Sequence, residues 1–154
     1  MPATQPVSGH SIEIRRTIAA APEKVFDAWT KPEKMNQWFC RAMETHKTTI
    51  HEVDLRVGGQ LRADIVSPEG KTWKLRGEYR EIRPAEKLVF TWSWENEPQH
   101  GETLVTVEFR RLGQSNFTEV LLRHEGFPSA DSCKDHTGGW NACLLTLEKA
   151  MAAA

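Results

Sequence analysis

The segment most informative about the fold is HTGGWNACLLTLEKAMAAA, residues 136–154. Its large apolar residues are spaced by four, three and four positions, which places them on one stripe of an α-helix: Trp140, Leu144, Leu147 and Met151. Asp131 and Ser132 are candidate N-caps, so we expect a helix from about Ser132 to the end of the chain. An apolar stripe of this length requires a partner surface to cover it.

Two adjacent glycines, Gly138 and Gly139, lie in the first half of this expected helix. Each costs about 1 kcal/mol relative to alanine inside a helix, so something must offset that cost. Together with Ala142 and Cys143, they leave this half of the helix nearly bare. The facing surface therefore either approaches closely or encloses unfilled space, and we favour the second alternative.

The length of 154 residues predicts one domain, over residues 10–154, after a lead-in at residues 1–9 that we expect to be disordered. A net charge of −1 with 27% charged residues does not favour nucleic acid as a partner or insertion into a membrane. The N-terminus lacks a signal peptide, and the three cysteines (Cys40, Cys133 and Cys143) lack zinc-like spacing. These features are typical of reduced thiols in a cytoplasmic protein.

The order of expected elements begins with a half-buried strand at His10–Ile18, where isoleucines alternate with polar residues. A helix begins at Pro22, because proline is favoured in the first turn, and Pro32 separates it from a second short helix through residues 35–38. From residue 48 to about 126 the apolar period is two, with frequent turn residues. We therefore predict six further strands in an antiparallel meander, covered on one face by the C-terminal helix.

The registers of four of these strands can be predicted by pairing apolar residues with one another. This pairing gives three inward-facing rows: Tyr79–Phe90–Val107–Val120, Gly77–Trp92–Val105–Leu122 and Leu75–Trp94–Thr103–His124. The opposite face collects charged residues, as expected for the solvated side of an antiparallel sheet. In this arrangement Gly77 leaves room for the indole of Trp92.

The succession of strand, two short helices, six-strand meander and long helix resembles the helix-grip fold of the START-like, or SRPBCC, superfamily. Shorter motifs resemble the branch named for the activator of heat-shock protein 90 ATPase. The residues that carry this likeness are Pro22-Glu23-Lys24-Val25-Phe26-Asp27-Ala28-Trp29, Trp38-Phe39, Val57-Gly58-Gly59, Gly77-Glu78-Tyr79, Leu88-Val89-Phe90-Thr91-Trp92, His124-Glu125-Gly126-Phe127 and Gly139-Trp140.

The resemblance implies an α+β protein with an apolar cavity between its sheet and long helix, used in this superfamily for lipids and other hydrophobic compounds. The co-chaperone for which the branch is named carries a further N-terminal domain that has no counterpart in this sequence. We therefore do not expect a chaperone partner, since a shared fold does not transfer function.

The inward face of the expected sheet and the bare part of the helix supply the predicted ligand-binding residues. These are Trp73, Leu75, Tyr79, Phe90, Trp92, Trp94, Thr103, Val105, Leu122, His124, Gly139, Trp140 and Cys143. Within this set His124 and Thr103 are polar groups at one end of an apolar surface. His124 is either a core histidine with satisfied hydrogen bonds or a residue that contacts the ligand.

The register of the strand near residue 62 decides whether Arg62 could bind an anionic group. If Arg62 faces Leu75, it points inward; if the register slips by one residue, Ala63 faces inward and Arg62 is solvated. The apolar spacing of Leu61, Ala63 and Ile65 favours the slipped register.

The sequence does not favour a metal or another cofactor. His46 and His51 are five residues apart and fall on opposite sides of a strand, while Asp135 and His136 have no second matched pair. We therefore predict binding of a small hydrophobic molecule. The alternatives are an enzyme of the cyclase or hydrolase type that uses His124 as acid or base, and a co-chaperone-like module that binds protein through the outer sheet face.

Overall fold

The computed structural model describes residues 10–39 and 46–153, where seven strands and three α-helices follow the predicted order. The elements are β1 (His10–Ile18), α1 (Pro22–Thr30), α2 (Pro32–Trp38), β2 (Lys47–Val53), β3 (Gln60–Val66), β4 (Thr72–Arg83), β5 (Lys87–Trp94), a 3-10 turn η1 (Pro98–His100), β6 (Thr103–Arg111), β7 (Thr118–Phe127) and α3 (Ala130–Ala153). The predicted lead-in at residues 1–9 and Cys40 lie outside the described residues.

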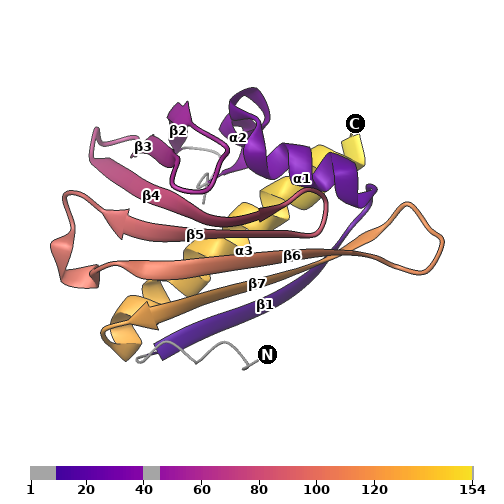
Figure 1. The fold of residues 1–154 in the computed structure, drawn as a ribbon. Helices are drawn as coiled ribbons and strands as arrows, with labels where there is room; N and C mark the ends of the chain where they lie inside the picture. The colour runs from indigo at the N-terminus through magenta and orange to yellow at the C-terminus, as the bar shows by residue number, and fades with distance from the viewer. Residues whose placement is uncertain (1–9, 40–45, 154) are drawn as a thin grey trace.

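The strands form one antiparallel sheet in the order β1-β7-β6-β5-β4-β3-β2, which confirms the predicted meander. The first strand pairs with the last, so β1 lies beside β7 at one edge although the two are far apart in sequence. Figure 1 shows the sheet curving and α3 crossing it behind, with α1 and α2 at one end. This is the helix-grip fold that the sequence predicts.

Helix α3 begins two residues earlier than expected, at Ala130 rather than near Ser132. The side-chain oxygen of Ser129 accepts a hydrogen bond from the backbone N–H of Ser132 at 3.1 Å, which is the usual geometry of an N-cap. The prediction of Asp131 or Ser132 as the cap was therefore wrong. Several cap-forming residues precede the apolar stripe, and periodicity does not choose among them.

Two of the three predicted strand registers are displaced. Between β4 and β5, Leu75 pairs with Trp94 and Tyr79 pairs with Phe90, as predicted. Between β5 and β6, however, Phe90 pairs with Val105 and Trp92 pairs with Thr103, two residues away from the prediction.

The pairing of β6 with β7 is displaced by the same amount. Val105 pairs with His124, Val107 with Leu122 and Phe109 with Val120. A shift of two residues keeps every side chain on its face of the sheet, so apolar matching cannot detect it. The register of antiparallel neighbours is set by the length and turn geometry of their connections, which are residues 95–102, containing η1, between β5 and β6, and residues 112–117 between β6 and β7.

The slipped register of β3 is confirmed, because Ala63 pairs with Leu75 and Arg62 pairs with Arg76. Arg62 lies on the outer face, 3.3 Å from Glu52, and does not supply a charge to the interior. We predicted that glycine is needed at position 77 to leave room for the indole of Trp92, but the structure gives a different reason. A Cβ atom at this position would collide with the backbone carbonyl oxygen of Thr91 on β5, so close approach of the two backbones excludes a side chain.

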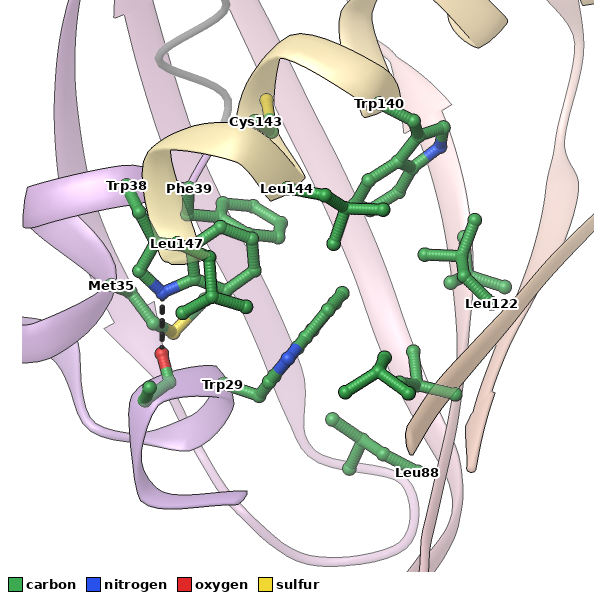
Figure 2. Packing of buried hydrophobic residues seen from close by; sticks show 14 of the residues in the cluster. Trp29, Met35, Trp38, Phe39, Leu88, Leu122, Trp140, Cys143, Leu144 and Leu147 are labelled. Carbon is green, nitrogen blue, oxygen red and sulfur yellow. Dashed lines mark hydrogen bonds between the residues drawn. The ribbon is translucent and has the colours of Figure 1, made fainter. Parts of the chain in front are cut away.

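The core fills the space between the sheet and the helices. Leu144 and Leu147 of α3 are fully buried, and the indole of Trp29 in α1 stacks on Trp140 with 5.9 Å between ring centroids. Figure 2 shows these side chains packed together, with the indole N–H of Trp38 donating to the carbonyl of Ala28 at 2.8 Å. Among the described residues, no helix is long and apolar enough to cross a membrane.

Candidate functional site

A cavity of about 350 Å³ lies under the first half of α3, where the glycine pair predicts unfilled space. Residues from β3, β4, β5, the 3-10 turn and α3 surround it. The lining residues are His46, Ile65, Trp73, Trp92, Trp94, Glu97, His100, Asp135, His136, Gly139, Trp140 and Cys143. Its volume falls in the range of pockets that hold small molecules.

At Gly139, α3 presents no side chain to the cavity, although Asp135, His136, Trp140 and Cys143 of the same helix line it. A Cβ atom built on Gly139 would meet no atom within 4 Å. Beyond this point the same helix carries Leu144 and Leu147, which are fully buried against the core (Figure 2). The cavity is therefore confined to the glycine half of the helix.

Four tryptophans form most of the apolar wall: Trp73 on β4, Trp92 and Trp94 on β5, and Trp140 on α3. Trp92 and Trp94 are two residues apart on one strand, so they share a face of the sheet. Their rings are nearly perpendicular at 5.4 Å, and Trp92 lies 5.1 Å from Trp140. Rigid rings at these angles leave flat surfaces on which an aromatic or alicyclic molecule can pack.

The cavity has a buried inner end and a more exposed outer end. Trp92, Trp140, Cys143 and Ile65 are buried, and Cys143 is a free cysteine. The outer end is formed by the exposed Asp135 and by half-buried residues. These half-buried residues are His46, Trp73, Trp94, Glu97, His100 and His136.

His124 lies beside the inner end in a buried chain of hydrogen bonds. The indole N–H of Trp140 donates to Nδ1 of His124 at 2.9 Å. Since an indole can only donate, Nδ1 carries no proton, and the neutral ring must be protonated at Nε2. Nε2 then donates to Oγ1 of Thr103 at 2.6 Å, and the Thr103 hydroxyl donates to the carbonyl of Trp92 at 3.2 Å.

His136 has the opposite tautomer at the outer end. The indole N–H of Trp94 donates to Nε2 of His136 at 2.8 Å, so the proton of the neutral ring is on Nδ1, which donates to the carbonyl of Ser132 at 2.8 Å. The side chain of Ser132 is 2.5 Å from Nδ1 of His100. These contacts hold the segment between β5 and β6 against the first turns of α3.

The buried His124 and the half-buried His136 both favour the neutral form. Burial lowers the pKa of His124 well below its usual value, and the nearby His136 lowers it further. Burial also lowers the pKa of His136, as does the neighbouring His100, while the hydrogen bond to Ser132 and the charge of Asp135 oppose the shift. Their ring centroids are 5.5 Å apart, so charging one disfavours charging the other.

The structure brings six of the thirteen predicted site residues to the cavity wall: Trp73, Trp92, Trp94, Gly139, Trp140 and Cys143. The other seven are buried in the surrounding core: Leu75, Tyr79, Phe90, Thr103, Val105, Leu122 and His124. Within this core the Tyr79 hydroxyl has no hydrogen-bond partner among the described residues, and burial raises its pKa.

Sequence reasoning missed six residues of the wall: His46, Ile65, Glu97, His100, Asp135 and His136. A usable signal existed for His136, because it precedes Gly139, Trp140 and Cys143 at helical spacing. No periodicity marks Glu97 and His100, which lie in a connection whose path depends on the whole sheet.

The residues considered for a metal site are not brought together. Nε2 of His51 is 3.0 Å from Asp64, whereas His46 packs near Trp73 at the cavity with 6.0 Å between the ring centroids. Within the described residues, histidine, cysteine, aspartate and glutamate side chains form no group of three or more that could hold a metal ion.

Comparison with known proteins relates this architecture to one family. Residues 19–152 match the family described as activator of Hsp90 ATPase homolog 1-like protein. No curated protein matches the chain.

Solved structures share the fold at low sequence identity. A Chromobacterium violaceum protein has a TM-score of 0.82 and 24% identity, with 92% of this chain and 96% of that chain covered. An AHSA1 protein from Silicibacter pomeroyi has a TM-score of 0.80 and 22% identity, with 94% and 99% covered. The family model covers most of the length of this chain. This chain therefore belongs to the family of activator of Hsp90 ATPase homolog 1-like proteins.

Proposed function

We propose that this protein binds a small hydrophobic molecule in the cavity between α3 and the sheet, and that it does so in the cytoplasm. The observation that carries the proposal is a space of about 350 Å³ walled by four tryptophans, beneath a glycine of α3 that fills none of it. Well-packed interiors leave few voids larger than a water molecule, so an apolar space of this size is a candidate binding site.

The proposal assigns no chemistry to His124. Both of its ring nitrogens are engaged by Trp140 and Thr103, so neither is available to exchange a proton with a bound molecule. The residue holds α3 against β6 and β7 beside the cavity. This arrangement favours binding over the acid–base alternative.

The glycine pair offers a direct test with a matched control. A Gly139→Leu variant places a side chain in the cavity, whereas Gly138→Leu places the same side chain beside a shallow groove that includes His10 and Ser11 of β1. Neither position has an atom within 4 Å of an added Cβ, so both variants should fold.

The measurement is a titration of tryptophan fluorescence with a panel of aromatic compounds and fatty acids. We expect saturable binding of at least one compound to the unmodified protein and to Gly138→Leu, and its loss in Gly139→Leu. Failure of the whole panel to produce a saturable response would contradict the proposal, as would undiminished binding in Gly139→Leu.

A further inference from the structure

The outer end of the cavity carries acidic side chains without basic ones. Glu97 and Asp135 line it, and the lining residues within the described part of the chain include no lysine or arginine. A molecule that enters the cavity displaces water from around these two carboxylates. A positive charge on the molecule offsets this partial loss of hydration, whereas a negative charge adds to the penalty.

The side chain of Asp135 leaves α3 on the face that lines the cavity. Asp135 lies one turn before Gly139, where an added Cβ would meet no atom within 4 Å, and residues four apart share a helix face. The Asp135 carboxylate is exposed and makes no hydrogen bond or ion pair with a described residue. Its oxygens are therefore available to a donor on a bound molecule.

Glu97 is held as a carboxylate beside the indole of Trp73. Nε1–H of Trp73 donates to Oε1 of Glu97 at 3.3 Å, and the side-chain amide of Gln99 donates to Oε2 at 2.7 Å. The hydrogen bond from Gln99 is the main cause that lowers the pKa of Glu97, and Lys71 and Trp73 lower it further, while burial opposes them. A negative charge is therefore fixed at the edge of a ring that lines the cavity.

The position of Lys71 shows that an ammonium group fits beside this carboxylate. Its Nζ is 3.5 Å from Oε1 of Glu97 and 4.7 Å from the centroid of the Trp73 ring, so a carboxylate and an aromatic face attract the same cation. The Lys71 side chain is 58% exposed, and exposed ion pairs contribute little to stability. A ligand ammonium can therefore replace Lys71 at this position.

We infer that the cavity takes a ring compound that carries a protonated amine, with its apolar body among the tryptophans and its ammonium group at the outer end, beside Glu97 and Asp135. The inference rests on the proposed function and specifies its ligand class. Burial of the rings supplies most of the affinity, and the charge at the outer end selects an amine over an acid of the same shape.

Three compounds with one ring system test the charge: 2-aminotetralin, the uncharged 2-tetralol and the carboxylate of tetralin. At pH 8 the amine is protonated, since alkyl ammonium groups have a pKa of about 10. Calorimetry should show that the amine binds at least about threefold more tightly than the alcohol, and the carboxylate at least about threefold more weakly. Equal affinities of amine and alcohol, or tighter binding of the carboxylate, would overturn the inference.

Two carboxylates of α3 provide a matched pair of variants. Asp131 and Asp135 are both exposed and lie one turn apart, but only Asp135 lines the cavity. The ratio of amine to alcohol affinity should fall about two- to fivefold in Asp135→Asn and stay unchanged in Asp131→Asn. An unchanged ratio in Asp135→Asn, or an equal fall in both variants, would contradict the assigned position of the ammonium group. Thermal unfolding verifies that each variant is folded.

Removal of Lys71 should have the opposite effect. In Lys71→Gln the competing ammonium is gone, so the affinity for the amine should rise about two- to fivefold while that for the alcohol stays the same. Lys74→Gln is the control, because this exposed lysine follows Trp73 on β4 and faces the other side of the sheet. An unchanged or lower affinity for the amine in Lys71→Gln would overturn the shared position.

The outcomes separate this inference from the proposed function. Saturable binding of the alcohol without a preference for the amine would contradict the amine and leave the proposed function intact. Absence of binding by all three compounds would also contradict the amine, and failure of the wider panel as well would contradict the proposed function.

Discussion

His124 and His136 are fixed in opposite tautomers by the tryptophans that face them. Each indole can only donate, so the histidine nitrogen that faces it must accept. Protonation of either imidazole would place its new N–H donor opposite the N–H donor of the indole that faces it. At the scale of single residues, the polar groups beside the cavity therefore act as connectors between α3 and the sheet.

Replacing Thr103 with valine tests this connection. The substitution keeps the shape of the side chain but removes the acceptor for Nε2–H of His124, which is fully buried. We expect the free energy of unfolding, measured by urea denaturation, to fall by about 1–3 kcal/mol. The control is Thr137→Val, which removes a bond to the Cys133 carbonyl on α3 and should cost less than about 0.5 kcal/mol. Equal losses in the two variants would contradict the interpretation.

At the scale of elements, α3 combines two different surfaces on one helix. Its second half packs Leu144 and Leu147 into the core, whereas Gly138 and Gly139 leave its first half open. The apolar stripe was predictable from helical spacing, and so was the bare segment. The position of the N-cap was not, because Ser129, Asp131 and Ser132 are all suitable residues.

Alanine substitutions separate glycines that are tolerated from glycines that are required. Gly138→Ala and Gly139→Ala add a Cβ in open space on a helix, so each should raise the free energy of unfolding by about 0.5–1 kcal/mol. Gly77→Ala should lower it, because the new Cβ would collide with the Thr91 carbonyl. Thermal and urea unfolding measure all three. Destabilisation by Gly139→Ala would indicate a backbone contact that closes the cavity.

At the scale of the whole molecule, His124 and His136 make stability depend on pH. Their pKa values are lowered in the folded protein, mainly by burial, so the unfolded chain binds more protons in mildly acidic solution. Their contribution to stability is fully present above the unfolded pKa of about 6.5 and is lost as the pH falls through the folded values.

We therefore expect the free energy of unfolding to decrease between about pH 7 and pH 5. A His136→Gln variant, which cannot titrate, should show a shallower decrease than the unmodified protein. Replacing His10, an exposed residue of β1, with glutamine provides the control and should leave the slope unchanged. Urea denaturation at several pH values gives the slope, and an identical slope for His136→Gln would contradict the assignment.

The order of the elements, the face on which each strand residue lies and the glycine segment of α3 could be predicted from the amino-acid sequence, because these properties follow from spacings of two and of three to four residues along the chain. The residues that oppose each other across β5, β6 and β7 become known from the three-dimensional structure alone, since a shift of two residues preserves every face. The structure also shows that Glu97 and His100 reach the cavity and that His124 is enclosed beside it. Those positions depend on the path of one connection and on distances between distant segments, which no local pattern records.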